Sequence, residues 1–548
     1  MTLALLALVA SSCGFSGDLR GGRRVLVMNN MAEPASLDPA LQSTVEEQRL
    51  TLGLFEGLMS HDPVTLRPIP GVARSVTVTD DDRLHTFHLR ECRWSNGDPV
   101  TAEDFVYAWR RVLAAPTDDP ARRPPGQRRL IACPCADLLD CIAGAADFRS
   151  GRSNDIGAFA VRAVDPRTLE VRLSRRTPWF HELLCFPTFM PVHPPTVEAH
   201  AEAWTRPEHF VGNGPFVLSE RRLGESIGVV RNPNYWEAGA VDLDGLVYLS
   251  TDQVDTALDQ YLAGESDWVR GFDPRKARAW RADPGLSLAL AAPEYLGTWF
   301  LRANCRKAPF DDPRLRRALA LALDRESICL HVTGMGERAA SGLVPAVLSR
   351  FMTWEPLGGA GGREAGLDYS PEEARRELAA AGFPGGRGLR PITLAFNSDV
   401  KNRSIAEAIQ AMWKTELGVD LRLLNREKRV HTAAERSGDY ELSRGSWVGD
   451  FHDPSTFLDI MRSNSGNNRT GWKDPAYDEM LDRAAVAADP AERRRLLQAA
   501  ERRLMVEEAP LIALFGLTTS FVLRPGRFAG IHENARDLHP PKWIRMLD

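Results

Sequence analysis

The sequence predicts an α/β protein that is divided into two large lobes or three domains. The chain has 548 residues, which is too many for a single hydrophobic core. Hydrophobic residues make up 43% and charged residues 26%, values typical of a globular protein rather than of a disordered chain or a polytopic membrane protein. A strand at 392–396, an amphipathic helix at 405–417 and a strand at 419–424 follow one another. This alternation is typical of an α/β lobe.

The amino-terminal half is predicted to alternate short strands with helices. Residues 24–29 form a first strand, and the apolar spacing after Thr44 predicts a helix to Leu58. Asn96-Gly97 predicts a turn, after which Thr101 caps a helix with Asp104 three residues on. The remaining elements predicted here are strands at 75–78, 84–89, 161–164 and 169–173, a helix at 178–186, and a hairpin of 216–218 with 227–231.

The carboxyl-terminal half begins with a predicted strand at 295–301. A helix over 310–323 follows, with Pro313 in its first turn and Asp311 or Asp312 as its cap. Another helix begins at Ser370 and ends before Gly382. The last predicted elements are helices at 475–488 and 490–508 and a strand at 510–515.

The stretch from 442 to 472 has the composition of a binding surface. It carries four aromatic residues, an acidic residue beside a turn-prone segment, and an amide-rich run: Trp447, Phe451, Phe457, Trp472, Asp450 and residues 464–468. Gly445, Gly449 and Pro454 exclude a regular helix, so we predict a loop over 445–454. Loops often carry function. The alternative is a solvated loop that Trp447 tethers.

Charge and motifs exclude several classes of function. The formal net charge of -5 and the pI near 6.2 argue against a nucleic-acid partner, which requires a basic face. Gly224-Glu-Ser226-Ile-Gly228 matches a nucleophile elbow, but a strand rather than the required helix follows Ser226. The chain also lacks HExxH and a P-loop. An enzyme therefore remains only as the alternative to a binding protein.

Seven cysteines follow Cys13: Cys92, Cys133, Cys135, Cys141, Cys185, Cys305 and Cys329. Cys133-Pro-Cys135 with Cys141 lacks the two-pair spacing of a zinc ribbon and has no nearby His. We therefore expect a loop disulfide there rather than a metal, and no cofactor.

The amino terminus has the features of an export signal. An apolar run from Met1 to Ala10, too short to cross a bilayer, is followed by Ser11-Ser12-Cys13. Small residues directly before a Cys resemble a bacterial lipobox. We therefore expect residues 1–23 to be a signal segment and linker, and Cys13 to be acylated.

Several segments, taken in order, resemble one family. Examples are residues 94–109, Asn213-Gly-Pro-Phe216 and Asp453-Pro-Ser-Thr-Phe457. The other segments are 33–39, 55–58, 70–73, 86–90, 231–236, 309–316 and 463–465. Together they resemble the extracytoplasmic family 5 solute-binding proteins of ABC importers, among which the oligopeptide-binding members are most similar.

The resemblance implies a type II periplasmic-binding-protein fold, with two α/β lobes that close by hinge motion around the ligand. Mapped onto this chain, the hinges fall near 295–298 and 514–518. Lobe one would be 24–65, 190–295 and 515–548, its extra subdomain 66–189, and lobe two 296–514.

The resemblance also implies the binding residues. In oligopeptide-binding members the acid of a W-x-x-D motif pairs with the ligand's α-ammonium group, and Trp447-Val-Gly-Asp450 matches that motif. Further residues implied for the same cleft are Arg444, Phe451, Asn467 and Asn468 from lobe two, and Glu33, Tyr107, Asn213, Gly214 and Phe216 from lobe one. The sequence departs from other members at Gly297 and Val448, where some have cysteines, and at Arg302, where an acid is common.

The function implied is that of a monomeric extracytoplasmic protein that captures peptides and delivers them to an ABC permease, bound to the membrane if Cys13 is acylated. Peptides would be held mainly through their main chain. Alternatives are an importer component for a non-peptide solute, a peptide-processing enzyme, and a receptor or chaperone for unfolded segments.

Overall fold

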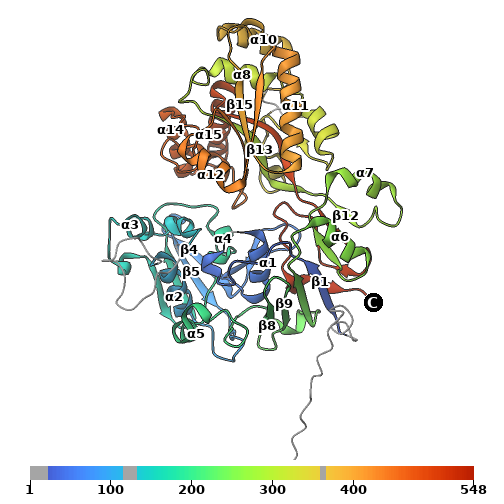
Figure 1. The fold of residues 1–548 in the computed structure, drawn as a ribbon. Helices are drawn as coiled ribbons and strands as arrows, with labels where there is room; N and C mark the ends of the chain where they lie inside the picture. Colours follow the sequence, from blue (N-terminus) through green and yellow to red (C-terminus); the bar gives the residue numbers. More distant parts are fainter. Residues whose placement is uncertain (1–22, 43, 115–132, 358–365) are drawn as a thin grey trace, which may run out of the picture.

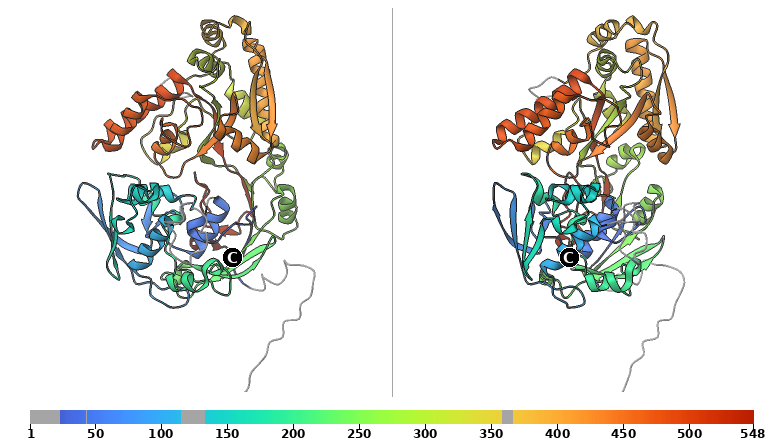
Figure 2. Two further views of the ribbon diagram at one scale, coloured as in Figure 1. Left: turned by 60° about the vertical axis from the view of Figure 1, so that its left-hand side comes forward. Right: turned by 90° about the vertical axis from the view of Figure 1, so that its left-hand side faces the viewer.

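The computed structural model describes residues 23–42, 44–114, 133–357 and 366–548, and it has two lobes (Figure 1). The expected α/β class with two lobes is confirmed. Figure 2 shows the same two bodies from two further sides. The lower lobe in these views contains the amino-terminal elements and the carboxyl terminus, and the upper lobe contains the elements from β13 to α15. Cys13, which is predicted to be acylated, lies outside the described residues.

A seven-stranded sheet forms the centre of the lower lobe. Its strand order is β12-β19-β11-β1-β10-β9-β8. The apolar strand β1 (Val25–Asn29) is buried along its whole length and pairs in parallel with β10 and β11. The other strands are β8 (Phe216–Arg222), β9 (Ser226–Arg231), β10 (Gly245–Leu249), β11 (Trp268–Arg270), β12 (Leu290–Ala291) and β19 (Phe521–Leu523). Ser226 opens β9, which confirms that no nucleophile elbow forms there.

A four-stranded antiparallel sheet lies beside the first one, in the order β4-β5-β7-β6. Its strands are β4 (Ala73–Thr79), β5 (Leu84–Leu89), β6 (Val161–Asp165) and β7 (Thr168–Arg172). As the alternation predicted, His85, Phe87 and Leu89 of β5 are the buried side chains. Helix α2 (Ala102–Leu113) packs against this sheet, and its predicted Thr101–Asp104 capping box is present.

The upper lobe contains a six-stranded sheet in the order β14-β18-β13-β17-β15-β16. The strands are β13 (Glu294–Ala303), β14 (Arg338–Ala339), β15 (Ile392–Asn397), β16 (Leu421–Arg426), β17 (Leu442–Val448) and β18 (Leu511–Thr518). Alternate side chains of β13 enter two separate hydrophobic clusters, Trp299 and Leu301 in one and Phe300 in the other. Both faces of the sheet are therefore covered.

Helices cover both sheets. In the lower lobe these are α1 (Val45–Leu54), α3 (Ala145–Ser150), α4 (Phe180–Leu183), α5 (Pro194–His200), α6 (Val254–Leu262) and α7 (Pro274–Ala282). In the upper lobe they are α8 (Pro313–Leu321), α9 (Arg325–Ser327), α10 (Pro371–Ala380), α11 (Val400–Leu417), α12 (Lys428–Ser437), α13 (Ser455–Leu458), α14 (Pro475–Val486) and α15 (Pro490–Arg502). The short strands β2 (Met59–His61), β3 (Pro68–Pro70), β20 (Phe528–Ala529) and β21 (Arg545–Met546) form two separate pairs.

The predicted loop over 445–454 is wrong in its first part. Residues 445–448 belong to β17, which pairs along its whole length with β13. Gly445 does not break this strand because its missing side chain leaves room for Arg302; a Cβ there would overlap the guanidinium group and lie 2.8 Å from the Phe300 ring. Only the segment after Val448 leaves the sheet.

Three predicted helices are shorter than expected. Helix α1 ends at Leu54 rather than near Leu58, and α4 is a single turn. Helix α15 ends at Arg502 and continues as a π-helical segment, Arg503–Glu508. Helix α11 begins earlier than predicted, because the Asp399 side chain accepts a hydrogen bond from the backbone N–H of Asn402 and caps it.

The chain passes between the two large sheets twice, at 292–293 between β12 and β13 and at 519–520 between β18 and β19. The ranges predicted as hinges lie just inside β13 and β18. These strands pair with each other, Thr298 opposite Gly516, and their register shifts between Glu294 and Thr298. On the other side of β13, Gly297 lies directly opposite Val448.

The expected loop disulfide is not formed. All seven cysteines from Cys92 to Cys329 are free thiols. The thiols of the predicted cluster have different partners: Cys135 donates to the Gln42 carbonyl (3.8 Å) and Cys141 to the Leu138 carbonyl (3.5 Å). Within the described residues, no three His, Cys, Asp or Glu side chains are grouped so that they could hold a metal ion. No described helix has both the length and the apolar composition needed to span a bilayer.

Candidate ligand-binding site

One edge of β17 is open over most of its length. On one side β13 pairs with every residue of the strand, but on the other side β15 pairs only with Leu442 and Ser443. Within the described residues, 444–448 therefore have no strand partner on that side. The carbonyl of Arg444 accepts a hydrogen bond from His431 Nε2 (3.2 Å). An open edge presents backbone donors and acceptors to which an extended peptide can add.

Asp450 follows this edge and supplies a half-buried negative charge. Its backbone N–H donates to Thr456 Oγ1 (3.0 Å), which fixes the turn after the strand. Burial raises the pKa of the Asp450 carboxyl to about 6, and the Asp137 charge adds to this, whereas Arg536 opposes it. No basic group of the described residues lies within ion-pair distance of the carboxylate. An ammonium group from a ligand could supply the missing positive charge.

The raised pKa of Asp450 makes binding of an amine pH-dependent. The carboxylate must be ionised to pair with an ammonium group, so affinity should be close to its maximum at pH 7 and should fall as the pH drops through 6, where about half of the carboxyl groups are protonated. For a peptide with a free amino terminus we expect the dissociation constant to be about tenfold larger at pH 5 than at pH 7, because the ionised fraction of the carboxyl falls by about that factor. Titration calorimetry at both pH values measures this. A tenfold loss that persists in Asp450→Asn would contradict the assignment to this carboxyl.

Arg444 supplies a half-buried cation on the same strand. Its Nη1 donates to the Asn397 amide oxygen (3.4 Å), and its guanidinium group lies 5.7 Å from the centre of the Trp299 ring. Burial lowers its pKa. Among the described residues no carboxylate lies within ion-pair distance of Arg444, so this group can accept an anion.

The aromatic residues of the predicted site have different environments. Trp447 is half-buried, and its indole Nε1 is buried without a hydrogen-bond partner among the described residues. Phe451 is buried, and its ring stacks on Trp179 from the lower lobe, with the centroids 5.1 Å apart and the planes at 2°. Phe451 thus packs between the lobes in this structure rather than offering an open surface. Phe457 and Trp472 are also core residues.

A second contact between the lobes lies next to Phe451. The Glu182 carboxylate on α4 accepts hydrogen bonds from the backbone N–H (2.6 Å) and the ring Nδ1 (2.8 Å) of His452. Neither Trp179 nor Glu182 was predicted to take part in a site, and His452 was predicted only as part of the turn-prone segment beside Asp450. Pro178-Trp179-Phe180 was visible only as a helix start, because nothing local indicates a partner more than 250 residues away.

The two asparagines differ in role. Asn468 donates its amide N–H groups to the carbonyls of Met461, Arg462 and Trp472, at 3.1, 3.2 and 2.9 Å. This side chain shapes its own loop. The Asn467 side chain is exposed.

The residues predicted from the lower lobe are separated. Glu33 accepts hydrogen bonds from Arg221 (2.8 Å) and Ser250 (3.0 Å), and Tyr107 is half-buried on α2. The Asn213 side chain is buried, bonded to the backbone N–H and carbonyl of Glu56. Gly214 packs directly on the backbone at Leu54, and Phe216 is fully buried. Asn213, Gly214 and Phe216 therefore pack at the start of β8 against the end of α1.

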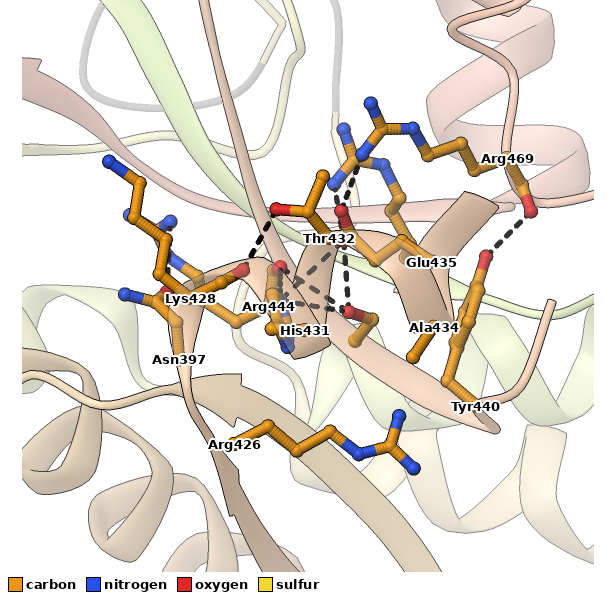
Figure 3. Close-up of polar contacts among 12 residues, drawn as sticks. Asn397, Arg426, Lys428, His431, Thr432, Ala434, Glu435, Tyr440, Arg444 and Arg469 are labelled. Atoms are coloured by element: carbon orange, nitrogen blue, oxygen red, sulfur yellow. Dashed lines mark hydrogen bonds and ion pairs between the residues drawn. The ribbon is translucent and has the colours of Figure 1, made fainter. Parts of the chain in front are cut away.

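Beside β17 lies a group of charged side chains on α12 and neighbouring segments (Figure 3). Glu435 Oε1 accepts hydrogen bonds from Arg302 Nη1 (2.8 Å) and Ser443 Oγ (2.9 Å), and Glu435 Oε2 accepts one from Arg469 Nη1 (2.6 Å). His431 lies one turn before Glu435, next to Arg444. The sequence indicated Arg444, but not that these residues would meet.

The fold has two α/β lobes joined by two crossings, with an open strand edge beside the boundary between them. The family model described as "Bacterial extracellular solute-binding proteins, family 5 Middle" matches residues 67–469. The chain belongs to this family of solute-binding proteins.

Curated relatives and solved structures are similar over almost the whole chain. The periplasmic murein peptide-binding protein MppA of Escherichia coli is 34% identical, covering 93% of this chain and 91% of its own. The periplasmic oligopeptide-binding protein OppA of Salmonella typhimurium is 32% identical, covering 95% and 93%. The structure of the E. coli murein tripeptide-binding protein MppA has a TM-score of 0.78 at 32% identity, covering 96% and 99%. The structure of Haemophilus influenzae OppA in complex with RPPGFSPFR has a TM-score of 0.77 at 28% sequence identity, and the match covers 96% of this chain and 99% of that one.

Proposed function

We propose that this protein is the extracytoplasmic binding component of a peptide ABC importer, which captures peptides between its lobes and delivers them to a permease. The observation that carries the proposal is the open edge of β17 followed by the half-buried carboxylate of Asp450, which has no ion-pair partner among the described residues. The edge offers main-chain hydrogen bonds, and the carboxylate offers a partner for a free amino terminus. The names of the relatives, which are peptide-binding proteins, support the same conclusion.

The proposed lobes are those predicted from the sequence: 24–65, 190–295 and 515–548 for lobe one, 66–189 for its subdomain, and 296–514 for lobe two. The two crossings between the sheets support a hinge there. Trp179 and Glu182 in the subdomain contact Phe451 and His452 in lobe two, so closure would complete the surroundings of Asp450.

Closure can be tested by solution scattering. Adding a peptide mixture to ligand-free protein should decrease the radius of gyration, because the lobes approach each other when the ligand bridges them. A mixture of the same peptides with acetylated amino termini serves as the control and should have a smaller effect. An unchanged profile at saturating peptide would contradict binding between the lobes.

We further propose that Cys13 carries a lipid that anchors the protein on the outer side of the cytoplasmic membrane or another extracytoplasmic face. The small residues before Cys13 support this proposal. Membrane fractionation of wild type and Cys13→Ser tests it, since only the wild type should remain with the membranes. Equal release of both into the soluble fraction would contradict it.

A further inference from the structure

The side-chain surface of β17 beside the open edge is positively charged. Arg302 of β13 lies directly over Gly445, the second residue of the open stretch 444–448. Its guanidinium group also lies 4.9 Å from the centre of the Phe300 ring. Because Gly445 has no side chain, it does not cover the guanidinium group of Arg302 on the side of the open edge. A peptide strand added there would place one of its side chains beside the guanidinium group, as neighbouring strands do.

The charges in this region do not balance. Arg302 and Arg469 share a single acid, Glu435, and Arg444 adds a third cation without an acid within ion-pair distance among the described residues. The nearest further acid that acts on Arg444 is Asp399. The side chains of Arg302 and Glu435 are only 8% and 6% exposed. Burial lowers the pKa of Arg302, and the neighbouring charge of Arg469 lowers it further.

A buried surplus of positive charge is unfavourable unless an anion compensates it. Glu435 cannot compensate the remaining positive charge, because its two carboxylate oxygens already accept hydrogen bonds from Arg302, Ser443 and Arg469. A carboxylate that arrived with the ligand would compensate the surplus. A ligand ammonium group would increase it.

We propose that the surface of β17 around Gly445 is a subsite for an acidic side chain of the bound peptide, formed by Arg302 with Arg469 beside it. The inference rests on the proposed function, because it needs a peptide along the edge of β17. It makes the protein selective for peptides that carry Glu or Asp at one position and against those that carry Lys there.

The position follows from the strand geometry. An extended chain advances about 3.3 Å per residue, and Gly445 is five residues before Asp450. A peptide whose amino terminus pairs with Asp450 should therefore reach Gly445 with an interior residue rather than with its first one.

The experiment is a positional scan by titration calorimetry. Alanine heptapeptides with a free amino terminus and an amidated carboxyl terminus carry one Glu, Gln or Lys at each of the seven positions in turn, so that the sixth residue, which should lie near Gly445, is an interior one. The amide ensures that the only carboxylate is the one on the side chain. At one interior position Glu should bind about tenfold or more tightly than Gln, the effect of a hydrogen bond to a charged partner, and Lys should bind more weakly than Gln.

Variants connect the preference to its source. In Arg302→Gln and in Arg469→Gln the ratio of Glu to Gln affinity should fall toward one, whereas Arg302→Lys should retain part of it. Each of these substitutions leaves Glu435 paired with the other arginine. Thermal unfolding verifies that each variant folds. The control is Arg426→Gln, an arginine of the same lobe that pairs with exposed Asp439; it should leave the ratio unchanged.

Two results would overturn the inference alone: affinities for Glu and Gln within twofold at every position, or a preference that survives in both Arg302→Gln and Arg469→Gln. In either case tight binding of the all-alanine peptide would leave the proposed function standing. If no heptapeptide and no shorter or longer peptide bound, the proposed function and this inference would both be rejected.

Discussion

Acetylation of a peptide's amino terminus is expected to weaken its binding to the wild-type protein by roughly thirtyfold to several thousandfold. The reason is the half-buried carboxylate of Asp450, which has no basic partner within ion-pair distance among the described residues and which closure of the lobes on a ligand would shield further from water. Leaving one charge of such a pair unmatched costs on the order of 2 to 5 kcal/mol, which corresponds to that loss of affinity. No other feature of the site is expected to have so large an effect on ligand binding.

A double cycle isolates the interaction. Wild type and Asp450→Asn are each titrated with the free and the acetylated form of one peptide, and the difference between the two acetylation penalties is the coupling. The penalty should be large in the wild type and small in Asp450→Asn. Asp439→Asn, at an exposed carboxylate of the same lobe, should behave as the wild type does. Equal penalties in wild type and Asp450→Asn would mean that Asp450 only shapes its turn through Thr456.

Replacement of Lys542 by Met is expected to lower the free energy of unfolding by about 3 to 5 kcal/mol, the typical cost of removing one partner of a buried ion pair. The Lys542 ammonium donates to Glu56 Oε1 (2.8 Å), and the two side chains are 6% and 4% exposed. Tyr235 and Trp236 donate to the same carboxylate at 2.8 and 2.5 Å. Without Lys542 the carboxylate would remain buried without its cation.

Urea unfolding of ligand-free protein measures the loss. The matched control is Lys414→Met, because Lys414 pairs with Asp420 at the surface, where the two side chains are 61% and 62% exposed. Such exposed pairs contribute about 0 to 1 kcal/mol. The double variant Glu56→Gln with Lys542→Met should recover part of the stability. Equal losses in the two single lysine variants would contradict the role assigned to Glu56 and Lys542.

Local signals in the sequence were sufficient to predict most elements. Thr101 with Asp104 identified the start of α2, and alternation identified the buried face of β5. Such patterns depend on contacts between residues a few positions apart. For Asp450, the turn-prone neighbours predicted a loop, whereas its role as the partner of a ligand's amino terminus came from the family resemblance and stays a prediction.

The tertiary structure decided where distant segments meet. Gly445 looked like a loop residue, yet it lies in a strand because Arg302 of β13 occupies the space of its side chain. Phe451 looked available for a ligand, yet it stacks on Trp179 from the other lobe.

By itself, then, the sequence determined the fold class, most helices and strands, and the acid that is proposed to bind the amino terminus. Only the tertiary structure decided the open edge of β17 and the grouping of Arg302 and Arg469 around Glu435. The physical reason is that helix caps and alternation act over a few residues. Strand pairing and the sharing of a buried charge join residues that are far apart in the chain, 133 positions for Arg302 and Glu435 and 34 for Arg469 and Glu435, and no local pattern specifies them.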